Sequence, residues 1–428
     1  MPTTVFQPAL SPPSRSPRRV FALLGVSLGY FMVLLDVTVL SVAEPDLARS
    51  LHASVGGLQW VVNGYTVAFA ALLLSAGAVA DRYGAQRVFR VGVGAFAALS
   101  LVSAAAPNLG TLVAARVALG VAGAACLPAS MALVVRLYPD PADRVRAMAV
   151  WAATSGAALA AGPVVGGVLV DLAGWRAIFL VDVPIAVVVL ALVNTAALRG
   201  PTGDRPIDVT AQVVACAVLA LLTDALIALG AGARAHAVAS GVGCVAAGAL
   251  LVVVERRSDA PALAPHVLRV RGATGAMLSG AAVNFTLTGA LFVLPLVLTR
   301  QWHLSPTRVG LAFLPLTLPC AFNPLLTGRI VARAGAARPV LAGLALLSSG
   351  AVVLGLATLR DAPYAVLAVG LALTGFGVSC TLPALAATVV AAAPEGSAGT
   401  AGGLLNASRQ VGATVGVAVM GALIAHGG

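Results

Sequence analysis

Two charged side chains stand inside apolar segments, where a charge is costly unless it meets a partner or water. Asp36 follows two leucines and precedes Val-Thr-Val-Leu, and Arg116 precedes Val-Ala-Leu-Gly. Asp36 lies eight residues before Glu44, and Arg116 lies seven residues after Leu109. At 1.5 Å per helical residue, each lies about 11 Å from the same surface, so we predict that they form an ion pair.

This expected pair has two interpretations. In the first, Asp36 takes up and releases a proton while its contact with Arg116 breaks and re-forms, because acids inside apolar segments usually serve a function. In the second, the pair is a permanent structural tie between two helices. Both interpretations stay open from the sequence alone.

The elements that carry these residues are apolar runs long enough to cross a membrane. Sixty per cent of the 428 residues are hydrophobic and 10% are charged, which excludes an ordinary soluble protein. A bilayer core of roughly 30 Å takes about twenty helical residues, and such spans must satisfy their own backbone groups. We expect an all-α membrane protein with about thirteen spans, at 20–43, 56–80, 89–107, 109–135, 146–170, 176–198, 208–230, 236–254, 273–299, 308–331, 338–358, 364–392 and 398–425.

The charge distribution indicates orientation. The net charge is +11, and the basic residues are arginines that gather in short segments on one side of the predicted spans. A lipid bilayer explains this pattern better than a nucleic-acid partner does. The positive-inside rule predicts a multi-pass protein of the inner (plasma) membrane, with its N-terminus and a tail at 1–19 in the cytoplasm.

The sequence has no recognisable motif for metal binding or catalysis. The five cysteines lie within apolar runs, and the five histidines do not cluster. Neither a zinc-protease helix, nor a nucleophile elbow, nor a phosphate-binding loop is present in the sequence. We therefore expect no enzyme activity, no cofactor and no metal.

A charged segment occurs twice. Residues 77–87 and 328–338 align without gaps, and both copies lie between long apolar runs. This pattern favours an internal duplication, which is common in transporters. The first copy follows the second span and the other follows the tenth, so the spans at 208–230 and 236–254 are inserted between the halves. The matching positions are Gly77, Arg82, Gly84, Ala85 and Arg87 with Gly328, Arg333, Gly335, Ala336 and Arg338.

The first copy, Gly77-x-x-x-Asp81-Arg82-x-Gly84-x-x-Arg87, resembles the signature loop between helices 2 and 3 of the major facilitator superfamily. The two inserted spans resemble those of its fourteen-span drug:proton antiporter branch. The resemblance implies a major facilitator fold of two six-helix-type bundles with two extra central helices. The N-terminal bundle is expected at 20–198, the inserted helices with their cytoplasmic linkers at 199–271, and the C-terminal bundle at 272–428. That last bundle is one span shorter than the branch has.

The resemblance also implies roles for individual residues. Asp36 and Arg116 match positions assigned to proton coupling, and the signature loop is expected to act as a conformational switch. A glycine-rich run resembles the motif diagnostic of antiporters, with plain helix packing as the alternative. Asp182 stands where the family usually has Asn and is a candidate for a second titratable group near the outer surface. The antiporter motif comprises Gly156, Gly162, Pro163, Gly166 and Gly167, and the residues expected to line a cavity are Thr38, Asn63, Tyr65, Asn284 and Arg409.

Arg409 lies near mid-membrane and needs an acceptor that the sequence does not identify. For Asn284, a hydrogen bond between helices is an equal alternative to a place on the cavity wall.

Together these features predict a monomeric, proton-coupled transporter that exports drugs, antibiotics or similar lipophilic, often cationic, compounds. The alternative is a proton-coupled symporter that imports a small nutrient on the same fold. The antiporter motif and the inserted helices weigh against that alternative.

Overall fold

The computed structural model describes residues 17–198, 200, 208–258, 272–360, 362–392 and 398–427. Most of the expected tail at 1–19 lies outside these residues, but its last three, from Pro17 onward, already belong to the first helix. The helices are α1 (Pro17–Ser50), α2 (Val55–Tyr83), α3 (Ala85–Ala104), α4 (Leu109–Leu137), α5 (Pro141–Ala173), α6 (Ala177–Leu180), α7 (Asp182–Leu192), α8 (Val209–Gly230), α9 (Arg234–Arg257), α11 (Ala273–Trp302), α12 (Pro306–Ala312), α13 (Leu314–Ala334), α14 (Ala337–Leu359), α15 (Tyr364–Ala392) and α16 (Ala398–Gly427).

The described chain is therefore all-α, with one short 3-10 turn at Ala196–Leu198 and no strand in the ranges given above. Within the described ranges, ten helices are long and apolar enough to cross a membrane, and the number rises to twelve if each of two bent pairs counts as one span. The one remaining expected span, 176–198, corresponds to Ala177–Leu192, which is shorter than the other spans. It ends before the predicted 198 because the Gln86 side chain donates to the carbonyls of Val193 and Thr195, both at 2.9 Å.

Polar side chains mark where several helices begin. Ser54 accepts a hydrogen bond from the backbone N–H of Gly57, and Asn108 accepts one from Thr111. Asp208 does the same for Ala211, and Ser305 precedes α12, whose first residue is Pro306. Such caps satisfy backbone donors that the first helical turn leaves free, so they fix where the chain enters the apolar layer.

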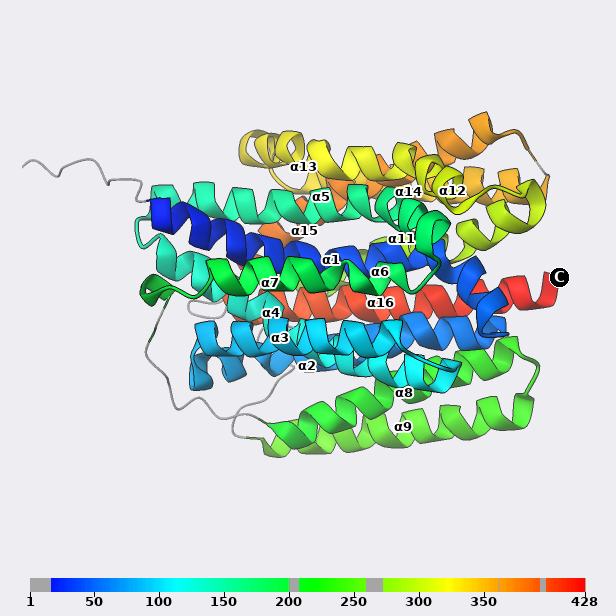
Figure 1. Ribbon diagram of the computed structural model, residues 1–428, viewed down its shortest axis with the longest axis horizontal. Helices are drawn as coiled ribbons and strands as arrows, with labels where there is room; N and C mark the ends of the chain where they lie inside the picture. The colour runs from blue at the N-terminus through cyan, green and yellow to red at the C-terminus, as the bar shows by residue number, and fades with distance from the viewer. Residues whose placement is uncertain are drawn as a thin grey trace, which may run out of the picture.

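The long helices run side by side along the long axis of the molecule (Figure 1). The packing repeats between the two halves: α1 packs on α5, α2 on α4 and α3 on α4, just as α11 packs on α16, α13 on α15 and α14 on α15. This repetition is what the duplicated sequence segment predicts. The inserted helices α8 and α9 pair with each other along one edge, and α8 packs on both α2 and α16.

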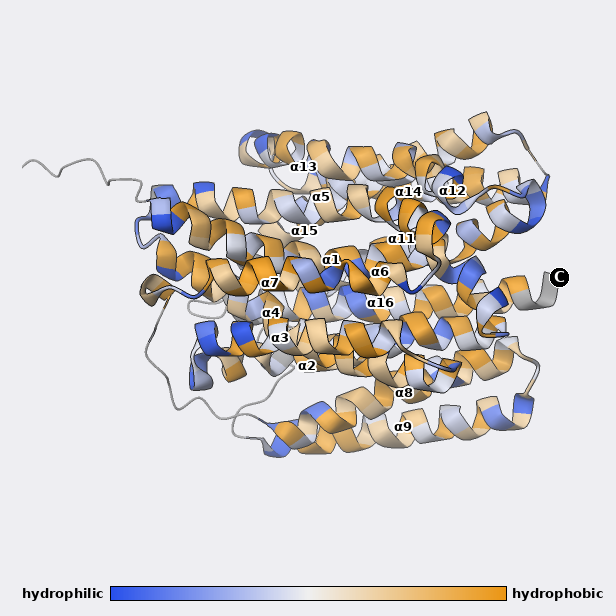
Figure 2. Ribbon diagram, viewed as in Figure 1, coloured by the Kyte–Doolittle hydropathy of each residue, from blue (hydrophilic) through white to orange (hydrophobic). Residues whose placement is uncertain are grey.

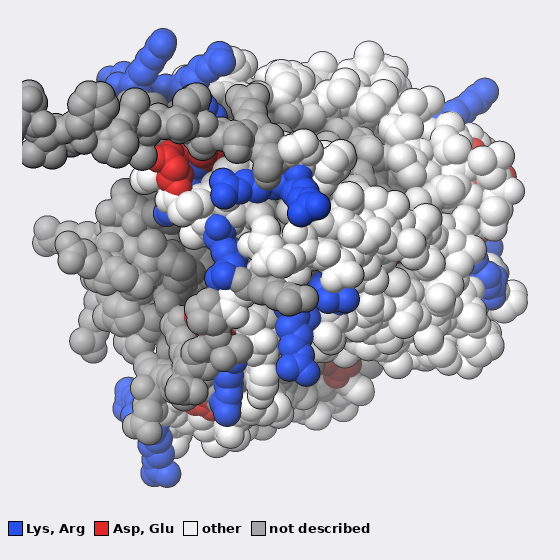
Figure 3. Space-filling view, turned by 60° about the vertical axis from the view of Figure 1, so that its left-hand side comes forward, with Lys and Arg blue, Asp and Glu red and all other residues white. Residues whose placement is uncertain are grey.

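Hydrophobic residues make up most of each long helix (Figure 2), and many of them are exposed on the outside of the bundle. On α9, for example, Val238, Val242 and Val245 are each more than 60% exposed. Arginines gather at the end where α1 begins (Figure 3), which we call the basic end. Its described arginines are Arg18, Arg19, Arg82, Arg87, Arg90, Arg136, Arg144, Arg146, Arg256, Arg257, Arg329, Arg333 and Arg338. The opposite end has Arg49, Arg176, Arg234, Arg300, Arg308 and Arg360.

The duplicated segments form the same turn. Gly84 separates α2 from α3 with φ 86°, and Gly335 separates α13 from α14 with φ 78°. The turn is shorter than the sequence predicted, because residues 77–83 still belong to α2. Gly77 and Gly328 lie in helices, and neither has another group within 4 Å of the place where a side chain would start.

We expect Gly84→Ala to destabilise the protein, because a side chain is strained at positive φ by about 1–2 kcal/mol. Gly77→Ala, in the same motif, should be neutral or slightly stabilising, since its site is helical and open. Thermal unfolding of the two purified variants in detergent checks this. Equal unfolding temperatures would contradict the assigned turn.

Candidate functional site

A central cavity of about 560 Å³ lies between the two halves. Its wall comes from α1, α2 and α5 on one side and from α11, α13, α15 and α16 on the other. Most lining side chains are apolar, and the volume is in the range that holds a drug-sized molecule.

The cavity is closed at the end opposite the basic end. There the Gln59 side chain on α2 donates to the carbonyls of Val417 and Ala418 on α16, at 3.0 and 2.7 Å. On the other side, Asp171 near the end of α5 accepts from the backbone N–H of Thr307 on α12 at 2.9 Å. Both contacts join the two halves. The lining runs along α5 as far as Ala149, eight residues from the start of that helix at the basic end.

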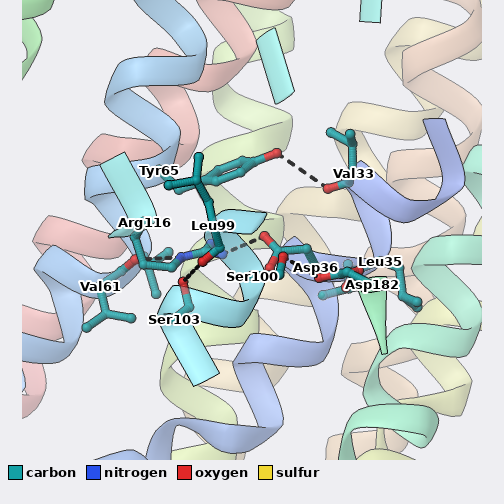
Figure 4. A network of polar contacts seen from close by, with 12 residues as sticks. Val33, Leu35, Asp36, Val61, Tyr65, Leu99, Ser100, Ser103, Arg116 and Asp182 are labelled. Carbon is teal, nitrogen blue, oxygen red and sulfur yellow. Dashed lines mark hydrogen bonds and ion pairs between the residues drawn. The ribbon is translucent and has the colours of Figure 1, made fainter. Parts of the chain in front are cut away.

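The expected ion pair is present beside this cavity (Figure 4). Arg116 Nη1 lies 2.5 Å from Asp36 Oδ2, and both side chains are at most 1% exposed. Arg116 Nε donates to the carbonyl of Val61 at 3.2 Å. Neither charged group lines the cavity. The Tyr65 ring separates them from it, since it lines the cavity and lies 4.6 Å from the guanidinium.

A third charged residue joins this pair. Asp182, at the start of α7, is fully buried and accepts a hydrogen bond from Ser100 Oγ at 3.3 Å. It lies within electrostatic range of both Asp36 and Arg116. The sequence named Asp182 as a candidate for a second titratable group, and the structure packs it against α3. Its closeness to Asp36 and Arg116 was not predicted, because it depends on how α6 and α7 pack.

The cluster of Asp36, Asp182 and Arg116 has one guanidinium for two carboxyl groups. One oxygen of each acid, Oδ1, has no hydrogen-bond partner in the described structure. Because a buried unpaired charge is strongly disfavoured, the cluster is most stable when one acid holds a proton. The arrangement can therefore store a proton in a closed site one side chain away from the cavity.

Four of the five residues expected to line the cavity do so: Thr38, Tyr65, Asn284 and Arg409. Asn63 is the exception, since it is not among the residues that line this cavity. On α2 the lining residues are Val62, Tyr65, Thr66 and Phe69. One residue turns a helix by about 100°, so Asn63 points away from the face of Val62. It is fully buried, and its amide atoms have no described partner.

Arg409 has amide acceptors rather than a carboxylate. Its Nε lies 3.3 Å from Asn284 Oδ1 on α11, and its Nη1 lies 2.9 Å from Asn406 Oδ1 one helical turn away. Asn284 thus both lines the cavity and makes a bond between helices, so the two alternatives for it hold together.

Glu44 is a cavity residue that the sequence did not reveal. The apolar run stops at Ala43 and Pro45 follows, which suggested a helix end. Instead α1 continues through Pro45 to Ser50. Glu44 is only 2% exposed, lines the cavity, and its Oε2 has no described partner.

The glycines of the antiporter motif are contact points on two faces of α5. A side chain added at Gly162 would meet Thr38, and one at Gly166 would meet the Val39 carbonyl of α1 at 2.7 Å. Gly167 faces the backbone of Pro306 and Thr307 on α12. These glycines therefore allow α5 to touch its own half and the other half closely.

Two other motif residues also lie where α5 meets the second half. Gly156 lines the cavity and faces the carbonyl of Cys320 on α13. The backbone of Pro163 packs against Gly310 of α12. In the signature loop, Asp81, Arg82 and Arg87 are exposed at the basic end.

Two repeated helical halves around a central apolar cavity define a membrane transporter rather than an enzyme. The chain belongs to the major facilitator superfamily, since the sequence model described as Major Facilitator Superfamily matches residues 26–266 and 273–428.

Its relatives carry drug-resistance names. It is 34% identical to the methylenomycin A resistance protein of Bacillus subtilis, over 96% of this chain and 89% of the relative. It is 33% identical to the multidrug resistance protein Stp of Mycobacterium tuberculosis, over 95% and 76% of the two chains. It is 31% identical to the tetracenomycin C resistance and export protein of Streptomyces glaucescens, over 94% and 75%.

Solved structures confirm the fold. An inward-facing, occupied bacterial homologue of the lysosomal transporter Spinster superposes with a TM-score of 0.67 at 16% identity, over 96% of this chain and 83% of that one. The xylose transporter XylE of E. coli, partially occluded and inward open, gives 0.65 at 15% identity, over 95% and 92%. The predicted family and fold class are confirmed.

Proposed function

We propose that this protein is a proton-coupled exporter of drugs, antibiotics or similar lipophilic compounds that works by alternating access. The resistance and export names of its relatives support the direction of transport. The apolar central cavity supports the kind of cargo.

The orientation follows from the arginines. The positive-inside rule supports an orientation in the inner (plasma) membrane with the basic end in the cytoplasm. We propose that the protein works there as a monomer. The contacts of Gln59 and Asp171 join the halves at the opposite end, which supports a state that faces inward. An exporter takes up its substrate in this state.

Proton coupling rests on one observation, the closed cluster of two acids and one guanidinium. A proton that reaches Asp36 or Asp182 removes a charge that holds Arg116. Arg116 packs on Tyr65, and Tyr65 lines the cavity and donates to the carbonyl of Val33 on α1. A change in the cluster is therefore passed to the cavity wall through one aromatic ring.

The movement itself uses the glycine contacts. When the halves rock, α5 must part from α12 at Gly167 and Gly310, while Gly162 and Gly166 keep it on α1. The exposed residues of the signature loop then act as the switch at the basic end, where the halves would close.

The decisive experiment measures flux in proteoliposomes with an imposed pH gradient. A neutral fluorescent lipophilic probe should move against its own gradient when protons move the other way, and an uncoupler should stop it. Expression of the protein in a pump-deficient host should raise the drug tolerance of the cells, and an uncoupler should abolish that increase. Probe and protons moving in the same direction would instead show the symporter. A probe flux that is the same with and without the pH gradient would exclude coupling.

A further inference from the structure

The cavity has two charged residues among its described lining, Arg409 on α16 and Glu44 on α1. They lie at different depths. Glu44 is six residues from the end of α1, or about 9 Å from the closed end. Arg409 is eleven residues from the start of α16, or about 16 Å from the basic end. No ion pair joins them in the described structure.

Arg409 differs from the other buried arginine in its partners. Arg116 is paired with a carboxylate, whereas the two acceptors of Arg409 are neutral amide oxygens. A guanidinium stays charged in proteins and has five N–H groups, of which these two bonds use two. Its remaining donors, including those on Nη2, have no partner among the described residues.

The neighbouring amide adds a further donor. Asn284 uses its oxygen to accept from Arg409, and its NH₂ group has no described partner on the cavity wall. Asn406, by contrast, donates its own NH₂ to the carbonyl of Gly402. The guanidinium of Arg409 and the amide of Asn284 thus have unused donors at one part of the cavity. Tyr30 lines the cavity within electrostatic range of Arg409, but no carboxylate pairs with Arg409 among the described residues.

Glu44 does not supply the missing negative charge. Its carboxyl group is almost fully buried, and Oε2 has no donor. A carboxylate in that setting is strongly disfavoured without a cation beside it, so a proton neutralises it in the empty cavity. The cavity then carries one uncompensated positive charge in an apolar wall.

We propose that Arg409, with Asn284, is the anion-binding site of this cavity and that the protein prefers lipophilic organic acids to amines of the same shape. This deepens the proposed export function and rests on it for direction, but binding itself does not depend on coupling. A carboxylate can accept from the free guanidinium N–H groups and from the Asn284 amide, while its apolar body lies against the remaining wall.

The test compares three ligands with one apolar body. The full-length protein in nanodiscs is titrated calorimetrically with 4-biphenylcarboxylate, 4-biphenylmethanol and 4-biphenylmethylamine, with empty nanodiscs as the blank. We expect the acid to bind about tenfold more tightly than the alcohol, and the amine to bind most weakly. Arg409→Gln should remove that preference and leave the affinity for the alcohol within about twofold.

Controls separate the charge from the fold. Arg300→Gln removes an arginine at the opposite end and should keep the preference for the acid. Glu44→Gln should also keep it, since that carboxyl is already neutral. If Arg409→Gln does not fold, Arg409→Lys, which keeps a charge but loses the planar donors, and Asn284→Ala should each weaken binding of the acid alone.

Several results would overturn the proposal. They are equal affinities for the three ligands, no measurable binding of the acid, or preferential binding of the amine that Glu44→Gln abolishes. Acid binding through Arg409 in a protein that shows no proton-driven flux would instead refute the coupling and leave the anion site standing.

Discussion

Asp36→Asn is expected to reduce proton-driven export to the background of empty vesicles, a loss of about a hundredfold or more, while the protein still inserts in the membrane. The reason is that the closed cluster then has one acid fewer and Arg116 loses its direct counter-ion at 2.5 Å. Probe efflux and pH change recorded in the same proteoliposomes check this. Proton-driven export at the wild-type rate would exclude Asp36 from coupling.

A double variant distinguishes coupling from a structural tie. Breaking a buried pair by removing one partner costs about 3–5 kcal/mol, so the single variant alone confounds the two roles. Asp36→Asn with Arg116→Gln removes both charges of the pair and leaves Asp182, which a proton can neutralise, so the double variant should regain thermal stability. We expect the double variant to stay uncoupled. Restored proton-driven export would show that the pair only ties α1 to α4.

Gly167→Val is expected to lower export at least about tenfold by keeping α5 away from α12. A side chain there would start 2.8 Å from the Pro306 carbonyl carbon and the Thr307 Cα, which are backbone atoms of the other half. Overpacking of this kind costs about 1–3 kcal/mol, and each 1.4 kcal/mol is a factor of ten in an equilibrium. The inward-facing state should therefore lose population.

Two measurements check this second prediction. The first is probe export, compared with Gly355→Val, whose site on α14 has no other group within 4 Å. The second is cross-linking between Asp171→Cys and Thr307→Cys in a background without the native cysteines. Cross-linking should fall in Gly167→Val and stay unchanged in Gly355→Val. Full export by Gly167→Val would show that this contact is not needed in the cycle.

The sequence predicted the features that depend on the position of a residue along a helix, such as the spans, the buried ion pair and the two glycine turns. Apolar runs had to be helices, because lipid offers the backbone no partners. The pairing of Asp36 with Arg116 was predicted, although α1 continues beyond Glu44, from which the depth of Asp36 was counted. The matching turns at Gly84 and Gly335 were visible because both copies keep the glycine that positive φ requires.

The direction in which a helical side chain points, and the residues that it contacts, could not be predicted from its position along the helix. Asn63 shares its depth with the cavity but points elsewhere, and only the packing of α2 decides this. Glu44 was hidden because a proline after it usually ends a helix, whereas here α1 continues. The partners of Arg409 lie on its own helix and on α11, which the sequence separates by more than a hundred residues.

The inserted pair has a consequence for how cargo arrives. The two halves meet along two lateral seams, one between α2 and α16 and the other between α5 and α12–α13. Helix α8 lies over the first seam because it packs on both α2 and α16, and α9 lies against α8 (Figure 1). The inserted helices therefore cover the α2–α16 side of the protein. A lipophilic molecule that diffuses within the membrane would have to enter the cavity laterally from the other side, past α5.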